Sequence, residues 1–390
     1  MPRILIVAAE ASSALYAEQL LLHWRNRGLE LTAFGVGSRS MEKLNFQCLG
    51  HAEDMAVMGF TEVIKHYSFI KSIFQKILNE VDRSKPDVAV LLDYPGFNLR
   101  LCKELHQRHI PIVYYVSPQI WAWKTKRVYT IKAFVSKMLV VFPFEVDFYK
   151  KYEVPVTYVG HPLLDELKAE HHNEEIIALK RNRLGIHKGE KVLGLMPGSR
   201  KQELDRHLEI QLQVAEKLKG KYPLLKIILL VAPTVSKEAI QERLGDVRVP
   251  VILLQDEPFN MISLVDGVLA ASGTATLMVG LLEKPMVIMY KVNALSAFIG
   301  RRLVKGFFGL VNVLSKREIV PEIFQEQANV QRLTPLVERA LFDEDYRSQV
   351  IQDLRLLKSQ MGEAGVTPRV AQEIEFYLPS SPADNRGSSK

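Results

Sequence analysis

The sequence predicts an α/β protein built from two Rossmann-like, doubly wound domains in succession. Short apolar runs of strand length alternate with amphipathic stretches, the pattern of a parallel sheet covered by helices on both faces. The alternation pauses in a charged segment at residues 167–190 and then begins again. With 390 residues and 47% hydrophobic content, the chain is long enough to bury two cores.

The first domain is expected to span residues 1–166. Apolar runs predict strands at residues 4–8, 31–36, 88–92, 112–116, 138–142 and 156–159. Between the first two runs, Leu20, Leu21 and Trp24 lie at helical spacing in a predicted helix at residues 13–26, and Gly28 offers a stop soon after its end. A similar pattern predicts a helix at residues 97–109.

The second domain is expected at residues 191–335, after a linker at residues 167–190. Its strands are predicted at residues 192–196, 227–231 and 251–254, and a helix is predicted between Leu204 and Leu218. Residues 336–378 are helical in character and are expected to pack back across the domains. Residues 379–390 are rich in serine, proline and charge, so we expect a disordered tail.

Two turns of the second domain have the composition of phosphate-binding loops. In the first, Gly198 lets the backbone approach a ligand, the following amides are expected to point at it unpaired, and Arg200 offers its guanidinium to phosphate oxygens. The second turn, with Ser272 and Gly273, follows another apolar run. Either turn alone also fits an ordinary strand-to-helix connection. Two such turns facing one ligand indicate a diphosphate.

Composition and charge exclude several classes of protein. The two cysteines, Cys48 and Cys102, cannot form a disulfide framework or a CxxC metal site, so we expect reduced thiols in a cytosolic chain and no metal centre. No uncharged apolar segment reaches the roughly 18 to 20 residues that cross a bilayer. The net charge of +7 is compatible with an anionic membrane surface or phosphorylated substrates. Without a nucleic-acid-binding signature, no nucleic-acid partner is expected.

The predicted ligand is a nucleotide sugar. The loop after the first strand, which begins at Glu10, has no GxGxxG pattern, and the chain has no GxxxxGK[ST] pattern, so a dinucleotide and a hydrolysed nucleoside triphosphate are disfavoured. Open α/β sheets bind ligands beyond the carboxyl ends of their strands. Two facing domains would therefore form a cleft with the donor in one wall and the acceptor in the other, which is the plan of GT-B glycosyltransferases.

Long motifs resemble those of the lipid-A-disaccharide synthase family over nearly the whole chain, in the same order. In the first half they are EAS at residues 10–12, MAVMG at 55–59, DYPGFN at 93–98 and YVSPQIWAW at 115–123. Further along they are PFE at 143–145, VGHP at 159–162, PGSR at 197–200, SGTAT at 272–276 and REIVPE at 317–322. Strings of this length are not generic.

The resemblance implies an inverting transfer between two acylated sugars. UDP-2,3-diacylglucosamine would donate its sugar to 2,3-diacylglucosamine 1-phosphate, giving a β-1,6-linked disaccharide 1-phosphate and UDP. One displacement needs one general base for the acceptor 6-hydroxyl and positive groups for the departing diphosphate. It needs no cofactor. The expected location is the cytoplasmic face of the inner membrane, as a peripheral protein, and a homodimer is left open.

The resemblance and the strand ends together nominate the site residues. Asp93 and Glu10 are the candidate general bases, although Asp93 also fits a helix cap and Glu10 an ordinary turn or ion pair. The candidate donor-binding residues are Ser199, Arg200, Glu203, Ser272, Gly273, Thr274, Asn312, Glu318 and Gln325. For Arg200 the alternative is a surface turn cap. Glu203 could orient Arg200, or it could simply favour the start of a helix through the helix dipole. Asn312, Glu318 and Gln325 also fit the role of helix caps.

The candidate acceptor and lipid contacts lie in the first domain. They are Ser12, Met58, Asn98, Ser117, Trp121 and Trp123. The two tryptophans precede basic residues and fit either a site for acyl chains and phosphate or a buried strand end before a solvated helix. Apolar and basic residues also mix at 55–76 and 296–308, which fits either contact with the bilayer or core-facing helices.

Three departures from common family patterns bear on activity. Ser13 and Ala14 replace a Gly-Asp pair, Gly96 stands where many relatives have a second Asp, and Met278 stands where many have Glu. These changes remove carboxylates near the predicted acceptor and ribose sites. One rival hypothesis is therefore a membrane-associated nucleotide-sugar-binding protein that has lost activity. A second, independent of these changes, is another GT-B enzyme acting on UDP-N-acetylglucosamine.

Overall fold

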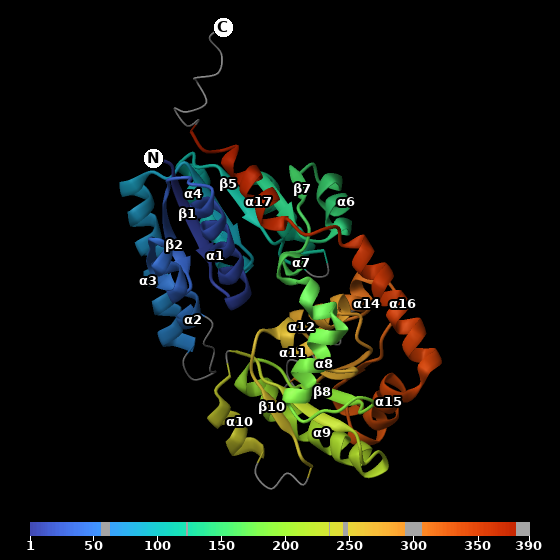
Figure 1. The fold of residues 1–390 in the computed structure, drawn as a ribbon. Helices are drawn as coiled ribbons and strands as arrows, with labels where there is room; N and C mark the ends of the chain where they lie inside the picture. The colour runs from blue at the N-terminus through green and yellow to red at the C-terminus, as the bar shows by residue number, and fades with distance from the viewer. Residues whose placement is uncertain (56–62, 122–123, 234, 245–248, 293–305, 380–390) are drawn as a thin grey trace. The chain divides into compact units, whose positions relative to one another are not determined.

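A computed structural model describes residues 1–55, 63–121, 124–233, 235–244, 249–292 and 306–379, with the backbone alone at 63–67 and 237. The chain divides into two compact units. Unit 1 comprises Met1–Asp165 together with Glu363–Lys390, and unit 2 comprises Glu166–Gly362. Each unit is an α/β domain with its own parallel sheet (Figure 1).

Unit 1 contains a seven-stranded parallel sheet in the order β3-β2-β1-β4-β5-β6-β7. Its strands are β1 (Arg3–Ala8), β2 (Thr32–Gly37), β3 (Phe46–His51), β4 (Val88–Leu92), β5 (Ile112–Tyr115), β6 (Lys137–Val140) and β7 (Val156–Tyr158). The central strands are buried on both faces, which explains why they read as continuous apolar runs. The edge strand β3, which contains Gln47, Cys48 and Gly50, has no such run and was not predicted.

The helices of unit 1 cover both faces of this sheet. They are α1 (Ala11–Asn26), η1 (Arg39–Leu44), α2 (Ala52–Met55), α3 (Val63–Ser84), α4 (Pro95–Gln107), η2 (Thr125–Arg127), α5 (Val128–Phe134), α6 (Pro143–Lys151) and α7 (Leu163–Glu166), whose last residue is counted in unit 2. From the far end of the chain, α17 (Val366–Glu375) joins them and packs on α1 (Figure 1). The Asp165 carboxylate accepts hydrogen bonds from the Gly365, Val366 and Thr367 amides and so caps the start of α17.

Unit 2 contains a six-stranded parallel sheet in the order β10-β9-β8-β11-β12-β13. Its strands are β8 (Val192–Met196), β9 (Lys226–Leu230), β10 (Ile252–Leu254), β11 (Gly267–Ala271), β12 (Met286–Tyr290) and β13 (Glu322–Phe324). Its helices are η3 (Ala169–His172), α8 (Glu174–Arg183), α9 (Lys201–Lys221), α10 (Lys237–Leu244), α11 (Pro258–Ser263), α12 (Thr274–Leu281), α14 (Leu310–Ser315), η4 (Gln325–Gln327), α15 (Val330–Phe342) and α16 (Glu344–Gln360).

The structure differs from the sequence analysis in two parts of the domain plan. Residues 167–190, expected as a linker, contain η3 and α8 and belong to unit 2, where Arg181 forms an ion pair with Asp266 at 3.1 Å and donates to the Leu264 carbonyl. This segment attaches through polar contacts, so it lacks the apolar periodicity that marks a core element. The C-terminal helices are divided: α15 and α16 pack in unit 2, and α17 packs in unit 1.

Candidate functional site

Two carboxylates lie close together at the carboxyl edge of the unit 1 sheet. Strands β1 and β4 are neighbours with Ala8 opposite Leu92, so Glu10 and Asp93 leave the same edge of the sheet. The pKa of Asp93 is raised to about 6, first by burial and second by the Glu10 charge, while a hydrogen bond from the Tyr94 amide acts in the opposite direction. The structure therefore brings together the two candidate bases and gives Asp93 an acidity near that of a histidine.

The backbone at Asp93 is held in an uncommon conformation. Asp93 and Tyr94 have φ angles of 45° and 44°, in the left-handed region that non-glycine residues seldom adopt. The Asp93 carbonyl accepts hydrogen bonds from Asn98 Nδ2 at 2.8 Å and from the Tyr114 hydroxyl at 2.5 Å. Asn98, a predicted acceptor contact, is fully buried and fixes the loop. The N-cap of α4 is Tyr94, so the structure does not place Asp93 at the cap position.

The loop after β1 shows what the replaced family residues do here. Ser13 Oγ accepts from the Glu10 amide at 3.1 Å and donates to the Glu10 carbonyl at 2.9 Å. Ser13 is buried, whereas Ser12 is exposed and Glu10 is partly exposed. Ser13 thus closes the turn at the start of α1 and holds the Glu10 backbone, and the Glu10 side chain remains accessible from solvent.

Glu145 is a buried carboxylate that was not among the predicted site residues. Ser117 and Trp121, the remaining predicted acceptor contacts that the structure describes, lie beside it. The Trp121 indole donates to Glu145 Oε1 at 3.2 Å, and the Phe142 amide donates to Glu145 Oε2 at 3.1 Å. The Ser117 and Tyr149 hydroxyls lie 2.8 Å apart. Burial raises the pKa of Glu145 to about 7, opposed by its hydrogen bonds. The PFE string was the available signal, because a carboxylate at the start of a helix commonly caps it. Met58 and Trp123 lie outside the described residues.

The two phosphate-sized turns of unit 2 are neighbours. Strands β8 and β11 pair with Ala270 opposite Met196, so both turns leave the same edge of one sheet. Glu203 Oε2 accepts from the Ser199 amide at 2.9 Å and from the Arg200 amide at 3.3 Å. The expectation that amides at this turn are unpaired is therefore wrong for these two, because the Glu203 carboxylate already satisfies them. The Arg200 side chain is exposed at the N-cap of α9.

In the second turn, some of the polar groups form hydrogen bonds within the protein. Ser272 Oγ donates to the Phe308 carbonyl at 3.2 Å, and the Ser272 amide donates to the Met289 carbonyl at 3.1 Å. Gly273 and Thr274 are exposed. Gly273 is the N-cap of α12 and has no side chain with which to cap it, and its carbonyl accepts a hydrogen bond from the Thr276 amide at 3.1 Å. Anion binding at the start of α12 stays a prediction of the sequence.

Two of the other predicted donor residues serve the backbone. Asn312 is fully buried and bonds the Ile319 and Val320 amides through Oδ1 and the Val320 carbonyl through Nδ2. Gln325 bonds both the amide and the carbonyl of Val292. Glu318 is exposed. Asn312 and Gln325 therefore shape the loops that follow β12 and α14.

His207 of α9 was missed by the sequence analysis, although it stands on the apolar face of a predicted helix. It is fully buried, with Nδ1 2.8 Å from the Pro197 carbonyl and Nε2 3.0 Å from the Lys291 amide. Burial lowers its pKa, although both of these backbone groups counteract the effect. A neutral imidazole with the proton on Nδ1 satisfies both bonds and anchors the first turn.

Comparison with known proteins decides the family. A family model described as lipid-A-disaccharide synthetase matches residues 4–373. The chain is 36% identical over 379 residues to the lipid-A-disaccharide synthase of Myxococcus xanthus, covering 97% of this chain and 98% of that protein. It is 38% identical over 374 residues to the enzyme of Anaeromyxobacter dehalogenans strain 2CP-C, covering 95% and 96%. The chain belongs to the lipid-A-disaccharide synthase family. It is accordingly a glycosyltransferase of lipid A synthesis.

Solved structures confirm the fold expected for this family. The UDP-GlcNAc 2-epimerase of Neisseria meningitidis, bound to UDP-GlcNAc, matches with a TM-score of 0.64 at 12% identity, covering 95% of this chain and 99% of that chain. The calicheamicin glycosyltransferase CalG4 matches with a TM-score of 0.61 at 13% identity, covering all of both chains. The two Rossmann-like domains of this lipid-A-disaccharide synthase family member therefore have the GT-B fold.

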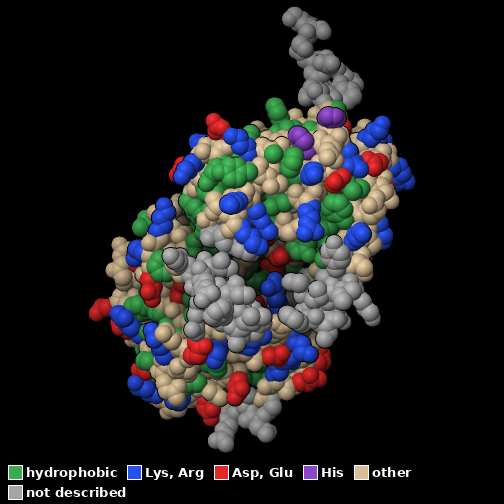
Figure 2. All heavy atoms as spheres, turned by 180° about the vertical axis from the view of Figure 1, so that it is seen from behind, with side chains coloured by type: hydrophobic (Ala, Val, Ile, Leu, Met, Phe, Trp, Pro, Cys, Tyr) green, Lys and Arg blue, Asp and Glu red, His purple; other side chains and the backbone are tan. Residues whose placement is uncertain are grey.

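The stretches considered for membrane contact in this family member are only partly described. No helix within the described ranges is long and apolar enough to cross a bilayer. In α3, Phe69, Ile70 and Phe74 pack against the core of unit 1, which favours the core-facing interpretation for that part of residues 55–76. Residues 293–305 lie outside the described part of the chain. On the face drawn in Figure 2, Lys and Arg side chains are interspersed with hydrophobic and acidic ones.

Proposed function

We propose that this protein transfers the sugar of UDP-2,3-diacylglucosamine to the 6-hydroxyl of 2,3-diacylglucosamine 1-phosphate with inversion. The acceptor oxygen attacks the anomeric carbon, the bond to UDP breaks, and the hydroxyl proton passes to a carboxylate. The products are the β-1,6-linked disaccharide 1-phosphate and UDP. Because both sugars carry acyl chains, the proposed place of action is the cytoplasmic surface of the inner membrane.

The observation that carries the proposal is the pairing of Asp93 with Glu10 at one edge of the unit 1 sheet. A general base works best when its pKa lies near the working pH, and the Asp93 pKa of about 6 leaves it ionised and basic at neutral pH. The rigid loop around Asp93 supports this role, because strained backbone collects at functional sites. Glu10 would tune Asp93 and contact the acceptor.

The adjacent turns of unit 2 support UDP binding. The exposed Arg200 guanidinium would bind diphosphate oxygens in a forked geometry, and the α12 amides after Gly273 would meet the same group. Glu203 would hold the Arg200 backbone in position through its bond to the Arg200 amide. Asn312 and Gln325 would act indirectly, by shaping the loops nearby. Both solved structures compared above share this fold, and one of them is described as bound to UDP-GlcNAc.

The experiment uses purified protein with both lipid substrates in mixed detergent micelles. Disaccharide and UDP are followed by mass spectrometry. Asp93→Asn should lower kcat about 10²–10⁴-fold, the usual contribution of a general base. Arg200→Ala should raise the KM for the donor and lower kcat, because the leaving group loses a charge partner. The exposed residues Asp147 on α6 and Arg183 on α8 provide matched controls, Asp147→Asn and Arg183→Ala, which should keep full activity.

The rival hypotheses give different results in the same assay. Turnover of UDP-N-acetylglucosamine without the lipid acceptor would support another GT-B enzyme. UDP binding without any disaccharide would support a protein that has lost activity, and would make Ala14, Gly96 and Met278 the positions to restore. Either result would overturn the proposed reaction.

A further inference from the structure

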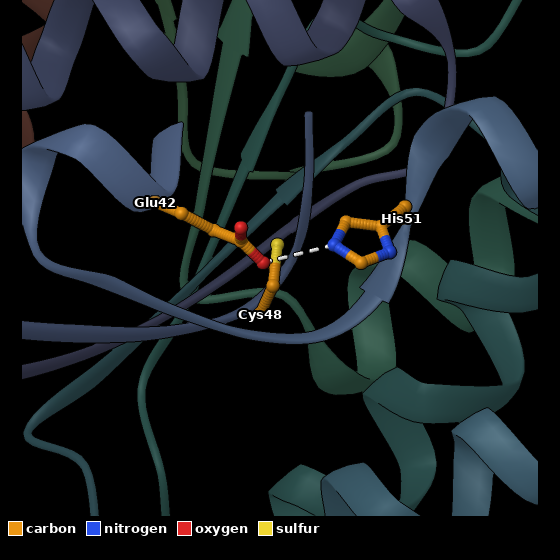
Figure 3. Close-up of side chains that lie close together, drawn as sticks. All are labelled: Glu42, Cys48 and His51. Atoms are coloured by element: carbon orange, nitrogen blue, oxygen red, sulfur yellow. Dashed lines mark hydrogen bonds and ion pairs between the residues drawn. The ribbon is translucent and has the colours of Figure 1, made fainter. Parts of the chain in front are cut away.

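Three side chains that commonly ligate metals meet at the edge of the unit 1 sheet, away from the carboxylate pair. They are Glu42 of η1 and Cys48 and His51 of β3 (Figure 3). One ligand atom from each, a carboxylate oxygen, a thiol sulfur and a ring nitrogen, lies within 4.8 Å of the others. Glu42 Oε1 and His51 Nε2 are 2.9 Å apart. The group is partly exposed, so an ion can enter from solvent.

A bulge in β3 explains why Cys48 and His51 share one side of the strand. Residues three apart in a regular strand point to opposite faces. Here Gly35 of β2 pairs with Cys48, Val36 pairs with Gly50 and Gly37 pairs with His51, so Leu49 is an extra residue. An extra residue resets the alternation and re-aims the side chains after it. For this reason the spacing of Cys48 and His51 in the sequence does not predict that their side chains lie together.

The surroundings of the three side chains orient His51. The second ring nitrogen, Nδ1, lies 3.5 Å from Asp54 Oδ2, so a carboxylate stands behind the ring while Nε2 faces Glu42 and Cys48. Arg39 forms an ion pair with Asp54 at 3.1 Å, and its amide donates to Glu53. The Cys48 sulfur lies 3.9 Å from each of the Gly37 and Ser38 carbonyl oxygens. Beside Glu42 itself, the cluster thus has the Glu53 and Asp54 carboxylates and the Arg39 guanidinium among its described neighbours.

We propose that Glu42, Cys48 and His51 bind a divalent transition-metal ion, with Zn²⁺ as the best match. Thiolate, imidazole and carboxylate form a ligand set that suits Zn²⁺, and three protein ligands with one water complete a tetrahedron. In that tetrahedron the nitrogen and oxygen ligands stand about 3.3 Å apart, so the Glu42 and His51 side chains need separate by only a few tenths of an ångström. Asp54 supplies the carboxylate that orients a metal-bound histidine.

Binding would exchange protons for the ion. The Cys48 thiol proton passes to solvent. The proton that joins His51 Nε2 to Glu42 leaves that nitrogen, and the neutral ring carries its proton on Nδ1, toward Asp54. Nε2 and the Glu42 carboxylate then each bond the metal, and no electron is transferred. The ion would join η1 to the edge strand β3 and to the residue that precedes α2. It would therefore stabilise the one edge of the sheet that the sequence leaves without an apolar run.

The test is a titration of the full-length, metal-free protein with Co²⁺ under reducing conditions, followed by competition with Zn²⁺. Tetrahedral Co²⁺ bound to a thiolate gives intense visible bands and a sulfur-to-metal charge-transfer band. We expect these bands to saturate at one ion per chain and to disappear when Zn²⁺ is added. Zn²⁺ should also raise the Tm of the protein.

Variants distinguish this site from adventitious binding. Cys48→Ser should abolish the charge-transfer band, whereas Cys102→Ala, which changes the buried cysteine of α4, should retain it. Asp54→Asn should weaken Co²⁺ affinity about 10–100-fold without changing the spectrum. Circular dichroism checks that each variant is folded. A spectrum without a thiolate band, or one unchanged in folded Cys48→Ser protein, would overturn the proposal.

Discussion

At the scale of single residues, the carboxyl groups of unit 1 are set apart by their surroundings. Glu145 is buried and Asp93 is partly buried, and in each case burial is the largest cause of a raised pKa. Asp93 also faces a second carboxylate, Glu10, whereas Glu145 is satisfied by the Trp121 indole and the Phe142 amide. Asp93, a carboxylate at a strand end with a like-charged neighbour, fits a role in proton transfer. Glu145, a carboxylate that accepts hydrogen bonds from the surrounding protein, fits a structural role.

The Asp93–Glu10 pair predicts the pH dependence of the transfer reaction. Activity needs ionised Asp93, so kcat/KM should fall as the pH drops through about 6. In Glu10→Gln protein the repulsion that raises the Asp93 pKa is removed, so the acidic limb should move to lower pH. Rate profiles between pH 4.5 and 8 measure the shift. If Glu10→Gln protein were inactive at every pH while Asp93→Asn kept activity, Glu10 would be the base instead.

Glu145 predicts a pH-dependent stability of unit 1. Its pKa of about 7 exceeds the usual 4.5, so the folded state binds the proton more tightly than the unfolded state. The resulting stability is present at low pH and is lost as the pH rises from 4.5 through 7, by an amount of the order of a few kcal/mol. Glu145→Gln should remove this loss. The free energy of unfolding of the variant should therefore rise relative to that of the parent as the pH rises.

Denaturant unfolding at several pH values measures this difference. His161, whose pKa burial lowers to about 3, acts in the opposite sense, because its neutral folded form loses stability as the pH falls below 6.5. His161 is unchanged in the variant, so comparison with the parent isolates the effect of Glu145. An equal pH dependence in both proteins would contradict the prediction.

At the scale of elements, the turn between β8 and α9 depends on close packing of Glu203 against Gly198. Gly198 has a φ of 122°, and a Cβ built there would lie 2.4 Å from Glu203 Oε2 and 2.6 Å from Glu203 Cβ. Only glycine permits both the backbone conformation and the approach of the carboxylate that caps the Ser199 and Arg200 amides. Gly198 therefore allows Glu203 to cap the two amides. By holding the turn in this shape, it acts only indirectly on the predicted ligand.

Gly198→Ala is therefore expected to destabilise unit 2 by roughly 2 kcal/mol or more and to raise the donor KM. Gly220 of α9, the helix that follows this turn, gives a matched control, because a Cβ there meets nothing within 4 Å. Gly220→Ala should stabilise unit 2 by roughly 0.5–1 kcal/mol. Thermal unfolding and donor titrations measure both variants. Equal effects of the two substitutions would show that Gly198 has no special role.

At the scale of the whole molecule, the two units differ in how the chain builds them. Unit 2 is continuous from Glu166 to Gly362, whereas unit 1 needs residues from both ends of the sequence. The contact of α17 with α1 includes a hydrogen bond from the Trp24 indole to Glu375 Oε1 at 3.0 Å, and Ile374 is fully buried. Without α17, the part of α1 that α17 covers would be exposed to water, while α1 would keep its contacts with β1 and β2.

Fragments of the chain test this difference. Residues 166–362 should unfold cooperatively as an isolated fragment, because its core is complete. Residues 1–165 alone should be less stable than the same residues joined to 363–379 by a short glycine-serine linker, which is feasible because Asp165 contacts the Gly365 amide at 2.6 Å. Circular dichroism melting curves compare the fragments. Identical melting of the two unit 1 fragments would contradict the role given to α17.

Local sequence patterns determined most of the sheet and the place of the carboxylate pair. Apolar runs predicted β1, β4, β5 and β8 to within about a residue, because strands buried on both faces need continuous hydrophobic residues. The position of Asp93 and Glu10 followed from the strand ends, since parallel strands share one carboxyl edge. The motif strings determined the family, which the comparisons confirmed.

Only the tertiary structure decided which polar groups already have partners. The cap of Glu203 on the Ser199 and Arg200 amides, the burial of Asn312 and the division of the C-terminal helices between units depend on contacts between segments. The cluster of Glu42, Cys48 and His51 depends on a bulge in an edge strand that has no apolar signature. Hydrophobic periodicity records how much of each segment is buried, whereas partners are chosen by geometry that arises when distant segments meet.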